Sequence, residues 1–305
     1  MNLLILTKRK RYYANIVADI LKANHSVTVS DSVKPCDILV TFDTLTKEEY
    51  KSSVRTIRVF AEDPEAELMS QFVTSNTEYA YGANEIWLLD LFESKKEIIQ
   101  TLYPTAKVFS IPILIQPTNM TPKLKARTAK LNVVIRVENG TFNEASWRQL
   151  LICELAHTQN PNLINTVWII NNTNLLCAEK MRQELKLHKD GKIRVFTDFS
   201  FPDLLGFFAG QGDRAVYLQN NIMDAYDPLA VLCAEQGIIP IHTSAFLQKE
   251  SVGIYYDHKD ITQGANLVSL AANADISKVP EAAKSCVSKY TLRPVHKALF
   301  QALLM

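Results

Sequence analysis

The sequence predicts an α/β protein with two doubly wound domains, and three observations support that prediction. Apolar segments of strand length alternate with helix-length segments along most of the chain, an order that favours parallel sheets covered by helices. The 305 residues suffice for two domains of ordinary size, and 47% of them are hydrophobic. The alternation is interrupted near residues 118–130, where prolines and basic residues replace the apolar pattern and indicate a linker.

The first domain is predicted over residues 1–117. Short apolar runs rich in Ile, Leu and Val suit strands that are buried on both faces. The predicted strands are 3–6, 26–30, 37–42, 56–60, 85–89 and 107–111, and the predicted helices are 14–23 and 91–102.

The second domain is predicted over residues 131–285. Its predicted strands are 132–135, 166–170, 193–196, 215–218 and 238–241, and its predicted helices are 146–156, 178–187, 202–208 and 228–236. The stretch 280–305 has the pattern of two helices separated near Pro294. We expect the helix within 286–305 to return toward the N-terminal domain.

Composition excludes several classes of protein. A net charge of +1 excludes a strongly basic, histone-like binder. No apolar run approaches the roughly 20 residues that a membrane span needs. The four basic residues near the start follow the apolar run, whereas those of a signal peptide precede it. The five scattered cysteines lack metal-ligand spacing, which predicts a reduced, cytoplasmic protein without a metal site.

The segment 219–244 contains the most informative pattern in the chain. It has the order of a strand end, a polar loop, a helix, a glycine stop and a short buried strand. Asp224, Tyr226 and Asp227 cluster at the helix start, where backbone N–H groups and the helix dipole favour an anionic ligand. Pro228 suits the first helical turn, and Gly237 ends the helix. The spacing alone also fits an ordinary helix–strand unit.

This segment resembles the donor-site helix of GT-B glycosyltransferases. It is more similar still to a little-characterised glycosyltransferase-like family of phages and proteobacteria, through Asn220-Asn221, Gly237, Pro240, His242, Ser244 and Gly253-Ile254-Tyr255-Tyr256. The larger retaining families carry two acids separated by seven residues. Here Asp224 matches the first and Leu232 occupies the second position, so the resemblance does not extend to their ribose contact or retaining mechanism.

The resemblance implies two Rossmann-like domains that face a cleft, with a nucleotide-sugar donor held by the second. It favours a UDP-sugar as co-substrate, with no tightly bound cofactor. Arg136 would neutralise the diphosphate, although a solvated arginine at a strand end fits equally well. Arg214 is a weaker second candidate, and His242 also fits a satisfied histidine at a strand end. The implied donor-binding residues are Arg136, Asn139, Thr197, Phe199, Gln219, Asn220, Asn221, Asp224, Tyr226, Asp227, Pro228, Leu229 and His242.

Glu62 and Asp63 are the candidate catalytic residues. They follow the predicted strand 56–60, and an inverting transferase needs one carboxylate as general base near the acceptor hydroxyl. The pattern is similar to phage DNA β-glucosyltransferases, in which a strand ends in Phe-Thr-Asp and the Asp is the base. The spacing favours Glu62 and the residue type favours Asp63. Asp43 and Asp90 are the alternative bases.

A basic and aromatic run after the first strand is the candidate acceptor site: Lys8, Arg9, Lys10, Arg11, Tyr12 and Tyr13. Four cations and two aromatic rings suit a polyanion, through phosphate contacts and base stacking. With the phage-like resemblance, this favours duplex DNA that contains hydroxymethylcytosine as the acceptor. A solvated charge run is the simpler interpretation. A glycan or lipid-linked acceptor, and a non-catalytic nucleotide- or nucleic-acid-binding module, remain as alternative functions.

Overall fold

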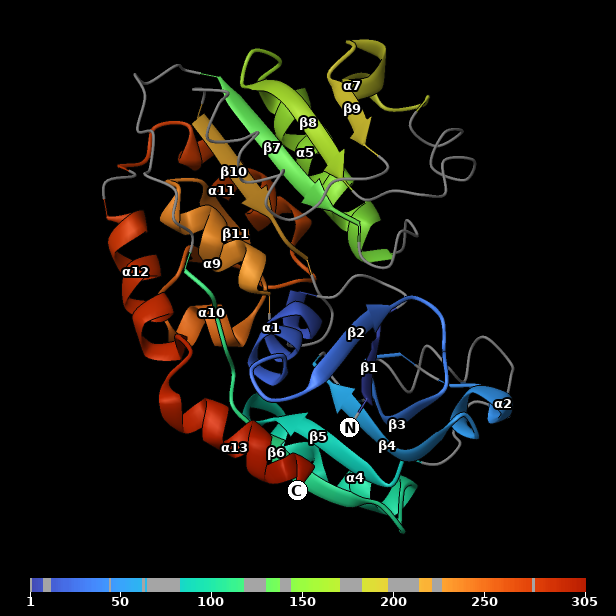
Figure 1. Ribbon diagram of the computed structural model, residues 1–305. Helices are drawn as coiled ribbons and strands as arrows, with labels where there is room; N and C mark the ends of the chain where they lie inside the picture. Colours follow the sequence, from blue (N-terminus) through green and yellow to red (C-terminus); the bar gives the residue numbers. More distant parts are fainter. Residues whose placement is uncertain are drawn as a thin grey trace. The chain divides into compact units, whose positions relative to one another are not determined.

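The computed structural model describes residues 2–7, 12–43, 45–61, 64, 83–117, 130–137, 144–170, 183–196, 214–220, 227–275 and 278–305. The chain forms two compact units, Met1–Gln116 with Tyr290–Met305 (unit 1) and Pro117–Lys289 (unit 2). Each unit is built on one sheet of six parallel strands (Figure 1). The predicted α/β class with two Rossmann-like halves is therefore confirmed.

Unit 1 contains the first sheet, in the order β2-β1-β3-β4-β5-β6. Its strands are β1 (Asn2–Leu6), β2 (Ser26–Ser30), β3 (Cys36–Thr41), β4 (Ser53–Phe60), β5 (Glu85–Leu89) and β6 (Lys107–Ile111). Its described helices are α1 (Tyr12–Leu21), α2 (Lys47–Tyr50), the 3₁₀ helix η2 (Asp90–Lys95), α4 (Lys96–Leu102) and α13 (Pro294–Leu304). Every residue of β5 is buried, as expected of a strand inside a parallel sheet.

The last helix, α13, belongs to unit 1 although 173 residues separate it from the rest of that unit's sequence (117–289). The buried ring of Phe300 packs edge-on against Trp87 of β5, with centroids 5.4 Å apart. Arg55 of β4 donates hydrogen bonds of 2.6 and 2.8 Å to the carbonyl oxygens of Leu303 and Leu304. These bonds satisfy carbonyl groups that the helix end leaves without an intrahelical partner.

Unit 2 contains the second sheet. Its strands are β7 (Leu131–Arg136), β8 (Ile164–Ile170), β9 (Ile193–Phe196), β10 (Arg214–Leu218), β11 (Ile239–His242) and β12 (Ile254–Tyr255). Its described helices are α5 (Glu144–Gln159), α7 (Lys186–Lys189), α9 (Pro228–Glu235), α10 (Ala245–Lys249), α11 (Ile261–Ala271) and α12 (Val279–Tyr290), whose last residue is assigned to unit 1.

The strand order of unit 2 determines where a ligand would bind. In the order β12-β11-β10-β7-β8-β9, the chain begins in the middle of the sheet at β7 and adds β8 and β9 on one side. It then adds β10, β11 and β12 on the other side of β7. The direction changes between β7 and β10, which pair in parallel. Open α/β sheets bind their ligands at the carboxyl ends of the strands beside such a switch point. The residues that end β7 and β10 therefore form the expected site.

The two faces of the second sheet have different covers. Residues Val133, Ile135 and Val216 share a buried cluster with α5 and α11. Because side chains alternate along a strand, Tyr217 points to the opposite face, where its hydroxyl contacts the residue that precedes α9. Figure 1 shows α5 and α11 behind the sheet and α9 in front of it. Val216 and Tyr217 of β10 thus point to opposite faces of the sheet.

Gly253 allows the edge strand β12 to approach β11 closely. Its φ of +87° lies in the region that favours glycine, and a Cβ atom here would lie 2.4 Å from the carbonyl oxygen of Pro240. Tyr255 then pairs with His242, and the Tyr256 N–H donates to the His242 carbonyl over 2.9 Å. Gly253 therefore places Tyr255 of β12 and the following Tyr256 beside the end of β11.

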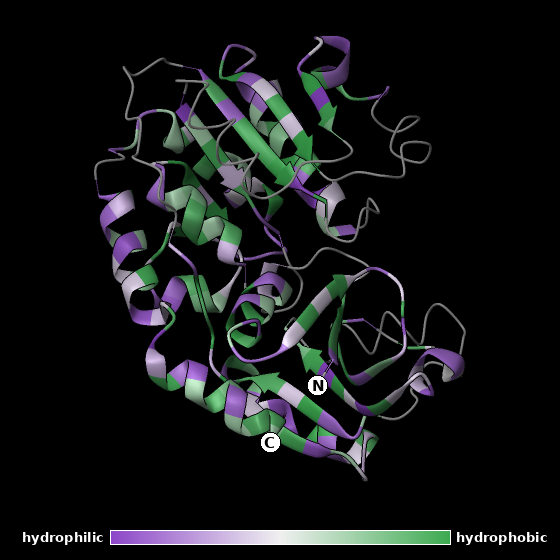
Figure 2. Ribbon diagram, in the orientation of Figure 1, coloured by the Kyte–Doolittle hydropathy of each residue, from purple (hydrophilic) through white to green (hydrophobic). Residues whose placement is uncertain are grey.

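Hydropathy follows this architecture. Figure 2 shows mainly hydrophobic strands in both sheets, whereas the outer helices α12 and α13 mix hydrophilic and hydrophobic residues. In the part of the chain that the structure describes, no helix combines the length and apolar character needed to cross a membrane.

Several predicted elements differ from the structure. The predicted helix 91–102 is divided into η2 and α4, and non-helical backbone angles occur at Phe92 inside η2 and at Lys95, the N-cap of α4. Of the predicted helix 178–187, only the four-residue α7 and the turn before it are described, and the predicted helix 202–208 lies outside the described residues. The elements α10, β12 and α11 lack a counterpart in the sequence prediction.

Candidate functional site

Polar side chains gather at the carboxyl ends of three neighbouring strands in unit 2. Arg136 is the last residue of β7, Gln219 and Asn220 follow β10, and His242 is the last residue of β11. The Gln219 N–H donates to the Ile241 carbonyl over 2.9 Å, which extends the pairing of β10 and β11 beyond the strand. These four predicted residues therefore lie at the strand ends beside the switch point.

Asp227 is the central group on the α9 face. It precedes α9, and its Oδ1 accepts a 3.0 Å hydrogen bond from the Leu229 N–H, which makes it the helix N-cap. Its Oδ2 accepts from the Tyr217 hydroxyl at 2.7 Å and from Gln219 Nε2 at 3.1 Å. Its carboxylate is only 4% exposed. Burial of this charge is offset by three hydrogen bonds and by the helix dipole.

This arrangement gives three of the predicted residues a structural role. Asp227 and the Leu229 N–H were expected to contact an anionic ligand, but the Asp227 carboxylate itself occupies that position at the helix start. Pro228 is in the first turn of α9, as predicted, and both Pro228 and Leu229 are buried parts of the helix. All three residues therefore have a structural role at the start of α9, and their donor-binding roles stay predictions.

Arg136 supplies the positive charge next to this carboxylate. Its Nη1 lies 3.8 Å from Asp227 Oδ1, and its side chain is 35% exposed. The nearby Tyr217 hydroxyl stays protonated, because burial first and the Asp227 charge second raise its pKa well above the ordinary value. A neutral Tyr217 donates to Asp227, and the side chain of Arg136 stays partly exposed.

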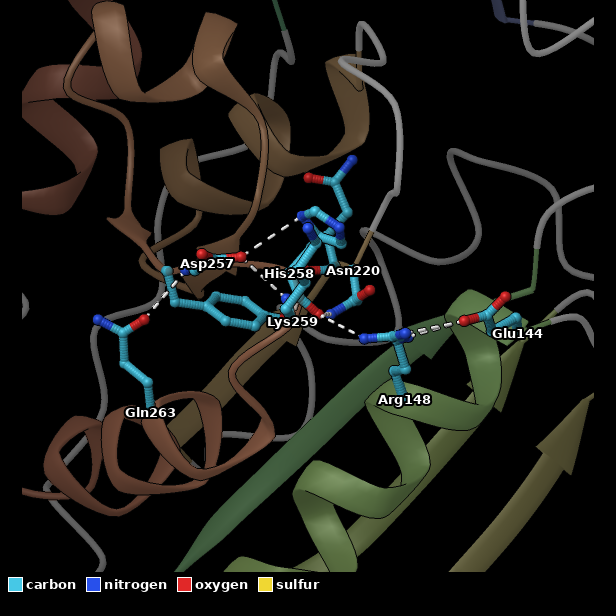
Figure 3. Close-up of polar contacts among 9 residues, drawn as sticks. Glu144, Arg148, Asn220, Asp257, His258, Lys259 and Gln263 are labelled. Atoms are coloured by element: carbon cyan, nitrogen blue, oxygen red, sulfur yellow. Dashed lines mark hydrogen bonds and ion pairs between the residues drawn. The ribbon is translucent and has the colours of Figure 1, made fainter.

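A second polar group lies on the α5 and α11 face, and the sequence did not reveal it. Asn220 Nδ2 donates to the Tyr256 hydroxyl at 3.0 Å and to the His258 carbonyl oxygen at 3.1 Å. Arg148 Nη1 donates to the same His258 carbonyl at 3.1 Å, and its Nη2 lies 2.8 Å from Glu144 (Figure 3). This group ties the end of β10 to the turn after β12 and to the first turns of α5.

The two groups are connected through one hydroxyl. The Tyr256 hydroxyl accepts from Asn220 and donates to the Gln219 carbonyl oxygen at 3.0 Å. Because Tyr256 is buried in the core beneath α5 and α11, it fixes the backbone at the end of β10. The two amide side chains that follow β10 are therefore held rigidly.

Two buried side-chain oxygens at these strand ends have no hydrogen-bond partner in the described part of the chain. They are Gln219 Oε1 and Asn220 Oδ1. Buried polar groups are hydrogen-bonded in more than about nine cases out of ten, so a cluster of exceptions marks a position where a ligand or water is expected. The amide oxygens of Gln219 and Asn220 mark such a position.

The imidazole of His242 is neutral at physiological pH. Burial lowers its pKa to about 4, and backbone hydrogen bonds with Val252 and Ser244 oppose this shift only in part. A neutral imidazole offers one donor and one acceptor. Its ring also lies edge-on to Tyr255, with centroids 6.1 Å apart.

Other predicted site residues lie outside the described part of the chain. They are the four basic residues Lys8 to Arg11, the acids Glu62 and Asp63, and the donor-binding candidates Asn139, Thr197, Phe199, Asn221, Asp224 and Tyr226. Of the alternative bases, Asp43 is buried. Asp90 accepts a 3.3 Å hydrogen bond from the Ile113 N–H, and partial burial raises its pKa.

The structure gives three residues with predicted binding roles contacts inside the protein. Tyr13 is buried and its hydroxyl donates to the Pro112 carbonyl, so its ring cannot stack on a base. The Tyr12 hydroxyl donates to the Gln116 carbonyl at 3.3 Å, which gives this residue a structural contact, and its acceptor role stays a prediction. Buried Arg214 donates to carbonyls at the end of α11, including that of Ala271 at 2.8 Å, so it caps a helix and cannot bind a diphosphate.

Comparison with known proteins identifies the fold. No protein-family model and no curated protein matches the sequence. Among solved structures, WaaG, a glycosyltransferase involved in lipopolysaccharide biosynthesis, aligns with a TM-score of 0.66 and 12% identity over 99% of each chain. Sucrose-phosphate synthase from Thermosynechococcus elongatus aligns with a TM-score of 0.62 and 10% identity, over 99% of this chain and 98% of that chain.

The pneumococcal O-GlcNAc transferase GtfA, solved in complex with UDP and GlcNAc, aligns with a TM-score of 0.53 and 11% identity. The alignment covers 95% of this chain but 58% of GtfA, so the chain spans little more than half the length of that protein. At these identities the likeness establishes the fold, which is the GT-B fold.

We predict that Asp227→Ala destabilises unit 2 by about 3–5 kcal/mol, because it removes a helix cap and leaves the buried Tyr217 hydroxyl and Gln219 amide without their acceptor. Asp260→Ala is the matched control. Asp260 caps α11 through a 2.7 Å bond from the Gln263 N–H but is exposed, so its loss should cost only about 1 kcal/mol. Urea denaturation followed by tryptophan fluorescence measures both. Equal losses would contradict the central role of Asp227.

We also predict a pH dependence that arises from His242. Its pKa is about 4 in the folded protein, below the usual value near 6.5, so between these values the unfolded chain binds a proton that the folded chain does not. Its contribution to stability is therefore present above pH 6.5 and is lost as the pH falls toward 4, by on the order of 3 kcal/mol. Urea denaturation at pH 7, 5.5 and 4 should give a shallower decrease for His242→Gln. Parallel curves for both proteins would exclude this origin.

Proposed function

We propose that the protein is a glycosyltransferase that takes a sugar from a nucleotide-sugar donor, with a UDP-sugar favoured. The observation that carries the proposal is the arrangement at the switch point of unit 2. A partly exposed guanidinium, Arg136, lies near two buried amides with unused acceptor oxygens and a neutral imidazole. A cation suits a diphosphate, and uncharged polar groups suit a sugar. The GT-B fold, shared with WaaG and GtfA, adds support from analogy.

In this proposal the donor diphosphate is bound by Arg136. During transfer the negative charge on the departing nucleoside diphosphate increases, and a fixed guanidinium stabilises that charge. Asp227 keeps the guanidinium in place from the buried side. The cation needs no large rearrangement when the donor enters, because its counter-ion belongs to the rigid α9 N-terminus.

The proposed general base is Glu62 or Asp63. Both follow β4, the strand that ends at Phe60, and a carboxylate at a strand end suits proton removal from an acceptor hydroxyl. Transfer assays on Glu62→Gln and Asp63→Asn distinguish the two, since the base is the residue whose loss abolishes transfer and leaves donor binding intact. If neither change affects transfer, the exposed Asp90 is the next candidate.

We predict that UDP-sugars stabilise the wild-type protein in thermal-shift measurements across a panel of nucleotide sugars. In isothermal titration calorimetry, Arg136→Gln should weaken binding by about 10–100-fold, the effect of losing one charge-assisted contact. Arg194→Gln, which changes an exposed arginine on β9, is the control and should bind like the wild type. If no nucleotide sugar shifts the melting temperature of the wild type, the transferase proposal is wrong.

The acceptor is a separate proposal, and the sequence favours DNA that contains hydroxymethylcytosine. Its support is the charge of Lys8 to Arg11, since the buried ring of Tyr13 no longer contributes. We predict that changing these four residues to Ala weakens binding of such DNA at least tenfold in 50 mM salt and flattens the salt dependence measured by fluorescence anisotropy. If the variant binds DNA as the wild type does and still transfers sugar to a glycan or lipid-linked acceptor, DNA is not the acceptor and the glycan or lipid-linked sugar takes its place.

A further inference from the structure

Gln219 and Asn220, which follow β10, form hydrogen bonds through their side-chain nitrogens and none through their side-chain oxygens within the described part of the chain. Gln219 Nε2 donates to the Asp227 carboxylate at 3.1 Å, and Asn220 Nδ2 donates to the His258 carbonyl at 3.1 Å. A carboxylate and a backbone carbonyl can only accept hydrogen bonds. The nitrogen of each amide must therefore face these partners, which fixes the position of each amide oxygen.

Both amide oxygens are enclosed and lack a partner. Gln219 Oε1 and Asn220 Oδ1 are buried, and neither contacts a donor in the described part of the chain. The rigid connection through Tyr256 prevents either side chain from turning away without breaking other bonds. Two fixed acceptors at a topological switch point are therefore expected to take donors from a bound molecule, with water as the alternative.

The missing donors define the chemistry of that molecule. An ionised diphosphate presents only acceptor oxygens, so it cannot satisfy an amide oxygen. The hydroxyl groups of a carbohydrate can. We propose that Gln219 Oε1 and Asn220 Oδ1 accept hydrogen bonds from carbohydrate hydroxyls of the donor, while Arg136 binds its diphosphate. This inference rests on the proposed nucleotide-sugar function and makes the two amides specificity-determining residues.

The hydroxyls can belong to the ribose or to the transferred sugar, and calorimetry on the unmodified protein distinguishes these sources. Wild-type protein is titrated with UDP, UDP lacking ribose hydroxyls, UDP-glucose, and UDP-glucose analogues that each lack one glucose hydroxyl. Removal of a recognised hydroxyl should weaken binding about tenfold, because a buried acceptor is then left unpaired. Losses within the UDP series indicate the ribose, and losses within the glucose series indicate the transferred sugar.

Two variants and one control link the effect to these atoms. Gln219→Met and Asn220→Leu should bind the complete and the deoxygenated ligands with equal affinity. Asn132→Leu removes a buried amide at the other end of β7, whose oxygen already accepts from Asn165 at 3.1 Å, and should keep the tenfold preference. Circular dichroism and thermal melting check that each variant is folded.

The outcomes separate the inference from the proposed function. A wild type that binds no nucleotide sugar would overturn both. A wild type that binds UDP-glucose and all its deoxygenated analogues equally well would overturn the inference alone, since water would then satisfy the amide oxygens. That comparison uses the unmodified chain and holds even if a variant fails to fold.

Discussion

The buried carboxylate of Asp227 is the constraint on which the arrangement of the second unit depends. It accepts hydrogen bonds from the first turn of α9, from Tyr217 on β10 and from the Gln219 side chain. A charge that is 4% exposed is tolerated only when such partners are complete, so α9 and the end of β10 cannot move independently. Because Asp227 occupies the helix N-terminus, the dipole of α9 stabilises a protein carboxylate, and an anionic ligand must find its positive charge elsewhere.

That positive charge is Arg136, and its setting has a second consequence. The guanidinium and Asp227 Oδ1 are 3.8 Å apart, so the pair carries little net charge. A bare diphosphate gains less from such a pair than from an isolated arginine. Binding must therefore draw on the uncharged groups nearby, namely the amide oxygens and the imidazole. The site thus suits a ligand that combines an anionic part with a neutral, hydroxyl-bearing part.

The sequence allowed most of the fold to be predicted, because the signals are local. Strands β2, β5, β6 and β9 have the predicted bounds, and Pro228 begins α9 as its fixed φ and missing N–H suggest. Asp227 directly precedes Pro228, a position that also suits a helix N-cap. The sequence analysis assigned Asp227 to donor binding and did not predict this cap. The predicted positions of Arg136, Gln219, Asn220 and His242 at strand ends are correct, while their binding roles are proposals.

The remaining features depend on contacts between residues far apart in the chain. Arg148 reaches His258 across 110 positions, and Asn220 reaches Tyr256 across 36. No periodicity of the sequence encodes such a pair, because each partner alone fits an ordinary surface arginine or core tyrosine. The same limit applies to Tyr13. Its position after four cations suggests stacking on a nucleic-acid base, whereas in the structure its hydroxyl donates a hydrogen bond to the Pro112 carbonyl.

The alternation of side chains at the end of β10 explains why one short segment can serve two purposes. Gln219 points to the α9 face and Asn220 to the α5 and α11 face, so each amide is anchored by a different helix layer. The Tyr256 hydroxyl joins the two anchors through the Gln219 carbonyl. A substitution on either face is therefore transmitted to the backbone that both amides share. Two adjacent amides fixed in this way can present their oxygens at constant positions, which makes a binding site more precise than one built on a loop.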